Sequence, residues 1–202
     1  MPERLRACDL DGLAPAPLNA AMTDPAAELP SIRRAHAGDA DALALAGAAT
    51  FLETFAGILD GANIVDHCRK QHAADLYAQA LADPACALWL AETAAGAAPV
   101  GLAMLTPPKL PLADQREHDL ELKRIYLLSR FHGGGTGRRL MQHAIDEARA
   151  RGAGRLLLGV YAGNERAQAF YARCGYVQVG EREFQVGRDT YRDTILALEL
   201  AA

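Results

Sequence analysis

The 202-residue sequence lacks a basic excess, a long apolar run and paired cysteines. A net charge of −4 gives no electrostatic footprint for nucleic acid and would suit a cationic substrate. No apolar run is long enough to span a bilayer, so we predict no membrane association. The four cysteines, Cys8, Cys68, Cys86 and Cys174, include no C-x-x-C pair. This scatter argues against a disulfide framework and favours a reducing cytoplasm.

Composition divides the chain into two predicted parts. Residues 1–30 carry acids and prolines without a continuous apolar core, so we interpret them as a flexible extension and not as a signal peptide or an anchor. Residues 31–202 are long enough for one domain with a substantial core. We therefore expect a single domain to carry the function.

Apolar periodicity predicts the order of helices and strands in this domain. Two helical segments (39–59 and 62–83) follow a short strand at 31–35. The other expected strands cover residues 86–92, 99–106, 120–128, 154–162, 176–186 and 191–200, and the other helices cover 138–152 and 164–175. This order predicts an α/β sandwich in which a mixed sheet carries helices on both faces.

A glycine cluster precedes the helix at 138–152. Four glycines occupy five positions, with Thr136 between them: Gly133, Gly134, Gly135 and Gly137. Such a cluster usually marks backbone that turns sharply or closely approaches a ligand. Because the cluster lies at a helix N-terminus, its free amides and the positive end of the helix dipole predict a phosphate site.

Two common phosphate motifs are excluded by the residues that follow the glycines. A P-loop needs Lys and a hydroxyl residue after its last glycine, whereas Arg138 and Arg139 stand here. A dinucleotide fingerprint, Gly-x-Gly-x-x-Gly, fails because its last position falls on Arg138 or on Leu140. The remaining pattern is residues 132–137, with glycines at its fourth and sixth positions and His132 at its first.

This six-residue pattern resembles the Gln/Arg-x-x-Gly-x-Gly/Ala signature of the GNAT superfamily of N-acetyltransferases. In that family the loop amides hold the pyrophosphate of acetyl-coenzyme A. The resemblance implies a mostly antiparallel central sheet flanked by helices, and acetyl-coenzyme A as co-substrate, with His132 in place of the usual Gln or Arg. The residues it assigns to the cofactor are His132, Gly133, Gly134, Gly135, Thr136 and Gly137, and Arg138 is added by adjacency.

The helix at 164–175 holds a second motif. Asn164 and Tyr171 are seven residues apart and therefore lie on nearly the same side of a helix. The segment "NERAQAFYARCGYVQVGE" resembles the N-x-x-A-x-x-F-Y-x-x-x-G-F segment of acetyltransferases, in which Asn contacts the cofactor and Tyr protonates the departing thiolate. From the residues alone, a helix cap and a packing aromatic are the alternatives.

A narrower resemblance extends over most of the chain after residue 30. The segments "FLETFAG", "LELKRIYLL", "LGVYAGNERAQAFY" and the tail from Gly175 are similar to bacterial PaiA-type spermidine/spermine N-acetyltransferases. This similarity implies a polyamine acceptor. Acetylation of a protein N-terminus or a lysine, and a non-catalytic acyl-coenzyme A sensor, are the alternatives, and the sequence leaves open whether the chain forms a homodimer.

The expected chemistry is direct attack by an amine on the thioester. A primary amine with a pKa of about 10 must first lose a proton, and the candidate base is Glu121, on the strand before the glycine loop. The alternative for Glu121 is an exposed strand carboxylate. The resemblance implies that main chain from Ile125 through Tyr126 to Leu127 pairs with the pantetheine arm, and an amide of this strand is the natural oxyanion donor.

Among the acids available for a cationic acceptor, Glu53 in the "ETF" segment is the candidate substrate residue because its neighbours are apolar. No metal is required by this chemistry. Cys68 and His72 have the i, i+4 spacing of two helix ligands, but two ligands do not make a site. We therefore predict a metal-free enzyme that acts on a small-molecule amine.

Overall fold

The protein is described by a computed structural model of residues 28–186 and 189–200, so most of the predicted extension, residues 1–27, lies outside the described residues. Seven strands form one sheet in the order β1-β2-β3-β4-β5-β7-β6. Their bounds are β1 (Ser31–Arg34), β2 (Ala87–Glu92), β3 (Pro99–Thr106), β4 (Asp119–Leu127), β5 (Arg155–Tyr161), β6 (Val177–Val186) and β7 (Asp189–Glu199). Only β4 and β5 pair in parallel among the described strands, so the predicted mixed, mostly antiparallel sheet is confirmed.

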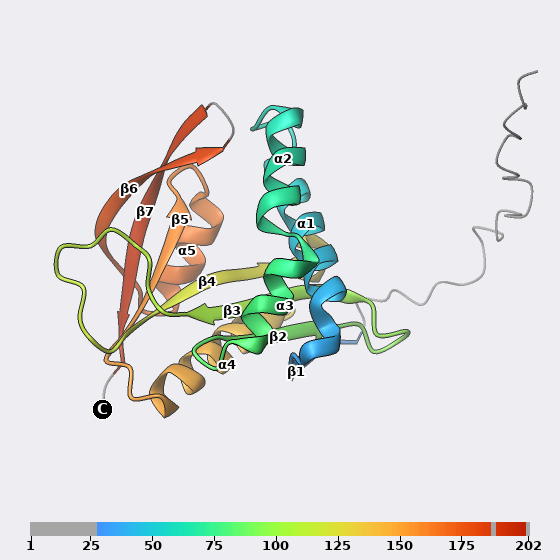
Figure 1. The fold of residues 1–202 in the computed structure, drawn as a ribbon, viewed down its shortest axis with the longest axis horizontal. Coiled ribbons are helices and arrows are strands. Elements are labelled where there is room, and N and C mark those ends of the chain that lie inside the picture. The colour runs from blue at the N-terminus through green and yellow to red at the C-terminus, as the bar shows by residue number, and fades with distance from the viewer. Residues whose placement is uncertain (1–27, 187–188, 201–202) are drawn as a thin grey trace, which may run out of the picture.

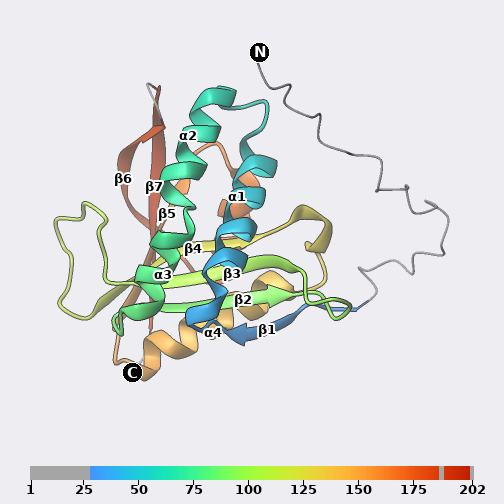
Figure 2. The ribbon, with the colours of Figure 1, turned by 45° about the vertical axis from the view of Figure 1, so that its right-hand side comes forward.

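Helices cover both faces of the sheet (Figure 1, Figure 2). The bounds are α1 (Ala40–Phe55), α2 (Gly61–Gln71), α3 (Ala74–Ala82), α4 (Thr136–Ala150) and α5 (Glu165–Arg173), with short 3-10 turns at Ala37–Asp39 and Ser129–Phe131. Leu88 and Leu90 of β2 pack with α1 and α3, whereas Trp89 and Ala91 pack in the cluster that contains α4. Because strand side chains alternate between faces, one strand contributes to two cores, and the predicted sandwich is confirmed.

The helical region between β1 and β2 differs from the prediction. The first helix ends at Phe55, and the chain turns through Gly57, which has a φ of 84°. The second predicted helix, 62–83, is two helices, because the segment breaks at His72 between α2 and α3. The buried His72 imidazole lies 2.9 Å from the Tyr77 hydroxyl. The His72 ring centroid also lies 5.8 Å from that of Tyr126 in β4, a long-range contact that helical periodicity does not reveal.

β4 and β5 are paired only at their beginnings. The register runs through Asp119, Leu120 and Glu121, and the two strands separate after Glu121. Each strand then stays paired on its other side only, β4 with β3 as far as Leu127 and β5 with β7 as far as Tyr161. The edge of β4 that faces β5 therefore carries free main-chain donors and acceptors beyond Glu121.

Two features shape this separation. Lys123 forms a bulge, since Leu122 pairs with Leu105 but Arg124 pairs with Met104. The joined end is fixed by Arg155, which is 1% exposed and donates to Asp119 at 2.7 and 3.1 Å. A buried ion pair of this kind is costly to break because the remaining charge lacks a partner.

Candidate active site

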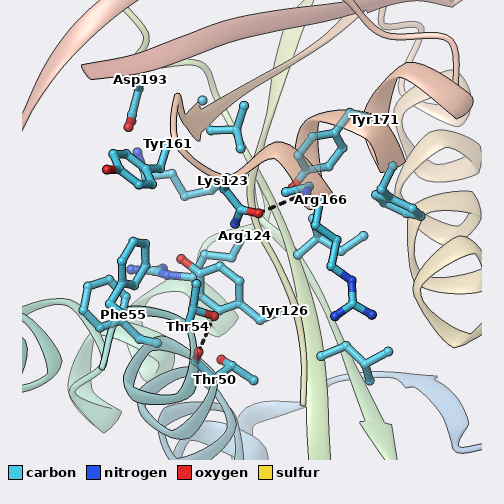
Figure 3. Close-up of a pocket in the computed structure, with 18 of the residues that line it drawn as sticks. Thr50, Thr54, Phe55, Lys123, Arg124, Tyr126, Tyr161, Arg166, Tyr171 and Asp193 are labelled. Atoms are coloured by element: carbon cyan, nitrogen blue, oxygen red, sulfur yellow. Dashed lines mark hydrogen bonds between the residues drawn. The ribbon is translucent and has the colours of Figure 1, made fainter. Parts of the chain in front are cut away.

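A cavity of about 590 Å³ lies between the separated parts of β4 and β5. It is within the range of volumes seen for ligand sites. Most of the predicted site residues line it: Glu121, Ile125, Tyr126, Leu127, His132, Gly133, Gly135, Gly137, Arg138, Asn164 and Tyr171. Figure 3 shows Arg166 and Tyr171 on one side of β4, and Thr50, Thr54 and Phe55 of α1 on the other. We call these the glycine-loop side and the aromatic side.

The glycine loop presents main-chain amides on the glycine-loop side. Gly133 and Gly135 have φ values of 88° and 90°, in the left-handed region that favours glycine. The first bond that closes α4 runs from Arg139 N to Gly135 O at 3.0 Å. The amides of Thr136, Gly137 and Arg138 consequently have no acceptor within the helix. Together with the helix dipole they suit an anion.

Side chains of the loop take different positions. His132 Nε2 lies 2.7 Å from the Leu127 carbonyl oxygen and ties the loop to the end of β4. Arg138 lines the cavity, whereas Arg139 donates to Pro30 O at 2.9 Å and so points elsewhere. Gly134 and Thr136 lie outside the lining, and the buried Thr136 Oγ1 has no hydrogen-bond partner among the described residues.

Tyr171 and Asn164 reach the cavity from α5. Asn164 Oδ1 accepts from Ala167 N at 3.0 Å and caps the helix, and the residue also lines the cavity. Tyr171 is 8% exposed and packs with Phe170 and Tyr176, at ring-centroid distances of 5.5 and 5.8 Å. Burial raises its pKa well above the ordinary value, because the charged phenolate is disfavoured. The side chain therefore stays protonated and available as a donor at neutral pH.

Glu121 lies at the point where β4 and β5 separate. It is 2% exposed, and its carboxylate accepts from Lys109 N at 2.7 Å and from Lys123 Nζ at 3.0 Å. The residue is thus a buried member of the cavity wall, which removes the alternative of an exposed strand carboxylate. Two donors already hold its oxygens.

Glu53 lies outside the cavity lining. Its carboxylate accepts from Ser129 N and from Ser129 Oγ, both at 2.8 Å, and so fixes the turn that leads into the glycine loop. The predicted contact with substrate stays a prediction. The geometry gives Glu53 a positioning role that the sequence did not indicate.

The aromatic side was not predicted as part of the site. We define the aromatic wall as Phe51, Phe55, His67, Phe184 and Tyr191, all of which line the cavity. Its ring centroids lie 4.0 Å apart for Phe51 and His67, 4.5 Å for Phe51 and Phe55, and 6.0 Å for His67 and Phe184. The wall joins α1 and α2 to β6 and β7. Only the i, i+4 spacing of the two phenylalanines was visible in the sequence.

The predicted pair of Cys68 and His72 is not part of a metal-ligand cluster in residues 28–186 and 189–200. No three of the described His, Cys, Asp and Glu side chains are grouped as metal ligands. The Cys68 thiol lies 3.9 Å from Ala48 O, and His72 contacts Tyr77. Among the described helices, none has the length and apolar character to cross a bilayer.

The cavity where the sheet splits, with its open loop amides at a helix N-terminus, suits a phosphate-bearing ligand. Residues 53–176 match the sequence model of the Acetyltransferase (GNAT) family, and the chain belongs to this family. It is therefore an N-acetyltransferase with acetyl-coenzyme A as the acetyl donor.

Known proteins agree with this assignment. An uncharacterized N-acetyltransferase of Mycobacterium tuberculosis is 34% identical over 162 residues, which cover 80% of this chain and 98% of that protein. The PaiA N-acetyltransferase from Thermoplasma acidophilum, solved in complex with coenzyme A, has a TM-score of 0.68 at 18% identity, over 85% of this chain and 99% of that one. A ribosomal-protein-alanine N-acetyltransferase from Brucella melitensis has a TM-score of 0.63 at 25% identity, over 84% and 99%.

The residues present fit acetyl-coenzyme A. The open amides of the glycine loop and the Arg138 guanidinium are donors for its phosphates. A Cβ built at Gly133 or Gly135 meets nothing within 4 Å, so the space beside both residues is open. Glycine is favoured at these positions because of the positive φ, not because of steric crowding. When bound, the cofactor supplies the activated acetyl group.

Proposed function

We propose that the protein transfers acetyl directly to a primary amine while both substrates are bound. One observation carries this proposal: Glu121, Tyr171 and the glycine loop all line the same cavity, where β4 and β5 separate. A single cavity that meets a cofactor loop on one side and an aromatic wall on the other favours simultaneous binding over a relay through the enzyme.

Tyr171 acts as the general acid in this proposal. Its burial keeps a proton on Oη at neutral pH, and its place in the cavity wall lets it deliver that proton to the departing sulfur. The phenol has to be neutral for this role. An ordinary tyrosine with a pKa of about 10 already meets this condition at neutral pH, and burial keeps the proton on Tyr171 at higher pH as well.

Glu121 is the base in this proposal. The amine arrives as ammonium and must lose a proton before it attacks. Glu121 accepts it directly or through water, and Lys123 holds the carboxylate in place. Main chain of β4 from Ile125 to Leu127 has a free edge toward β5, which supports pairing with the pantetheine arm.

A polyamine acceptor stays a prediction. Carboxylates at staggered distances would recognise a polycation, but the two carboxylates of the described cavity lining, Glu121 and Asp193, are each bonded to a cation of the same lining. A small primary amine is the acceptor class that we propose here. A cytoplasmic location is proposed only on the grounds of the sequence, which leaves a homodimer open.

Steady-state kinetics tests direct transfer. Release of free coenzyme A is measured with purified protein over a matrix of acetyl-coenzyme A and amine concentrations. Intersecting double-reciprocal lines are expected, since both substrates must bind before transfer. Parallel lines would indicate an acetylated enzyme, and binding of acetyl-coenzyme A without turnover on any amine would favour the sensor instead.

A further inference from the structure

Positive charge dominates the lining of the cavity. Its cations are Lys123, Arg124, Arg138, Arg166, Arg173 and Arg182. Its carboxylates are neutralised locally: Glu121 pairs with Lys123 at 3.0 Å, and Asp193 accepts from Arg182 at 2.8 and 3.0 Å. A cavity with this balance favours anionic groups and disfavours a polycation.

The remaining cations separate into two groups. Arg138, Arg166 and Arg173 belong to α4 and α5, on the glycine-loop side, where they suit the cofactor's phosphates. Arg124 belongs to β4 and reaches the opposite face, where its guanidinium carbon lies 5.3 Å from the Tyr77 ring centroid. Cofactor binding on the glycine-loop side therefore does not explain the positive charge of Arg124 on the aromatic side.

Arg124 retains free binding capacity. Its Nη2 donates to Gln71 O at 2.7 Å and its Nη1 contacts Met104 Sδ at 3.1 Å. No carboxylate in the described part of the chain comes within 4.0 Å of the guanidinium nitrogens. A guanidinium has five N–H donors in a fork that matches a carboxylate, so donors remain for a ligand.

The environment of Arg124 contains no compensating carboxylate among the described residues. Burial, and next the charge of Arg124, lower the pKa of His67 to about 4, so the imidazole is neutral at pH 7. The groups that contact its guanidinium are uncharged: the Gln71 carbonyl, Met104 Sδ and the Tyr77 ring. The aromatic wall lines the same cavity as Arg124. An incoming anion would compensate a partly desolvated cation there.

We propose that the acceptor is an amine that also carries a carboxylate and an apolar body, as an aromatic or branched α-amino acid does, with Arg124 binding the carboxylate and the aromatic wall binding the body. The inference rests on the proposed acetyl transfer. It narrows the acceptor from small amines in general to amino carboxylates. The amino nitrogen of this acceptor is acetylated by the direct transfer proposed above. An N–C bond forms, the thioester C–S bond breaks and one proton reaches the sulfur.

Matched acceptor pairs test the proposal. Release of coenzyme A is measured with phenylalanine and with 2-phenylethylamine, which lacks only the carboxylate, and with spermidine and a lysine peptide. We expect kcat/KM for phenylalanine to exceed that for phenylethylamine by about tenfold to a hundredfold, the range for a charge-assisted hydrogen bond. In the Arg124→Met enzyme the preference for phenylalanine over phenylethylamine should disappear, while Arg124→Lys should retain part of it. Arg69→Met, on the surface of α2 and outside the lining, is the matched control.

The outcomes separate this inference from the proposed function. Turnover with equal use of both members of the pair, preference for spermidine, or an unchanged ratio in Arg124→Met would overturn the inference and leave acetyl transfer intact. If no acceptor is turned over, calorimetry measures the binding of phenylalanine and of phenylethylamine to the protein's complex with coenzyme A, and this comparison tests the inference. Preference for the amino acid that Arg124→Met abolishes supports the inference, and equal or absent binding refutes it. Thermal unfolding of each variant excludes a loss of folding as the cause.

Discussion

The two sides of the cavity are built from different material. On the glycine-loop side, one continuous segment supplies main-chain amides and a helix N-terminus, with Arg138 as an added donor. On the aromatic side, single side chains converge from α1, α2, β4, β6 and β7. A main-chain site tolerates exchange of side chains as long as the backbone conformation is kept. A site made of side chains changes with each substitution. On the proposed assignment of the two sides, we expect the fold to determine cofactor binding and individual residues to determine the choice of acceptor.

The largest effect is expected at the junction of the two sides. Tyr171→Phe keeps the ring packing but removes the proton that we assign to the departing sulfur, so kcat should fall by about 10²- to 10⁴-fold with little change in either KM. Burial raises the pKa of Tyr171, so its ionisation should not produce the alkaline limb of the wild-type pH profile below about pH 10. A variant with wild-type kcat would remove Tyr171 from the mechanism.

A glycine substitution tests whether the glycine-loop side binds the cofactor through its backbone conformation. Gly135→Ala meets no neighbour within 4 Å, but its φ of 90° is strained for alanine and should cost about 1–2 kcal/mol of unfolding free energy. Because the loop relaxes, KM for acetyl-coenzyme A should rise about tenfold while KM for the amine stays the same. Gly61→Ala, at the start of α2 with equally open space, should instead stabilise the protein by about 0.4–1 kcal/mol. Chemical denaturation and initial rates measure both effects.

Glu53 distinguishes positioning from substrate contact. If Glu53 acts through Ser129 on the glycine loop, Glu53→Gln should raise KM for acetyl-coenzyme A by about two- to fivefold, as for one weakened hydrogen bond. If it contacts the acceptor, as the sequence suggested, KM for the amine should rise instead. Separate titrations of the two substrates decide between these roles.

The smallest effect concerns the charge on the aromatic side. His67 has a pKa of about 4 in the folded protein against about 6.5 when unfolded, so the unfolded chain binds more protons between these values. Its contribution to stability is therefore complete above pH 6.5 and declines as the pH falls toward 4. Arg124→Met removes a repelling cation and should shift the His67 pKa upward, which an NMR titration of the imidazole would detect. An unchanged pKa would mean that Arg124 does not act on this ring.

The same contrast explains what the sequence could predict. The glycine loop and the pair Asn164 and Tyr171 are local motifs with fixed spacing, and the structure places Asn164, Tyr171 and most of the loop residues in the cavity wall. The succession of strands along the chain followed from apolar periodicity, whereas their order in the sheet was not predicted. The break at His72 and the aromatic wall depend on contacts between residues far apart in the chain, which periodicity does not encode. Arg124 was visible only as the last charge of an alternating strand, a weak signal.

The three-residue register between β4 and β5 has a thermodynamic consequence. Within the described sheet, the β1–β4 half and the β5–β7 half are hydrogen-bonded to each other only along Asp119, Leu120 and Glu121 with their partners in β5. A molecule that bonds to the free edge of β4 and to α5 therefore joins the two halves and resists their separation. Binding linkage then adds about 2.7 kcal/mol to the unfolding free energy when the ligand is at a hundred times its Kd. On the proposed pairing of the pantetheine arm with β4, the co-substrate itself strengthens the connection between the two halves of the sheet.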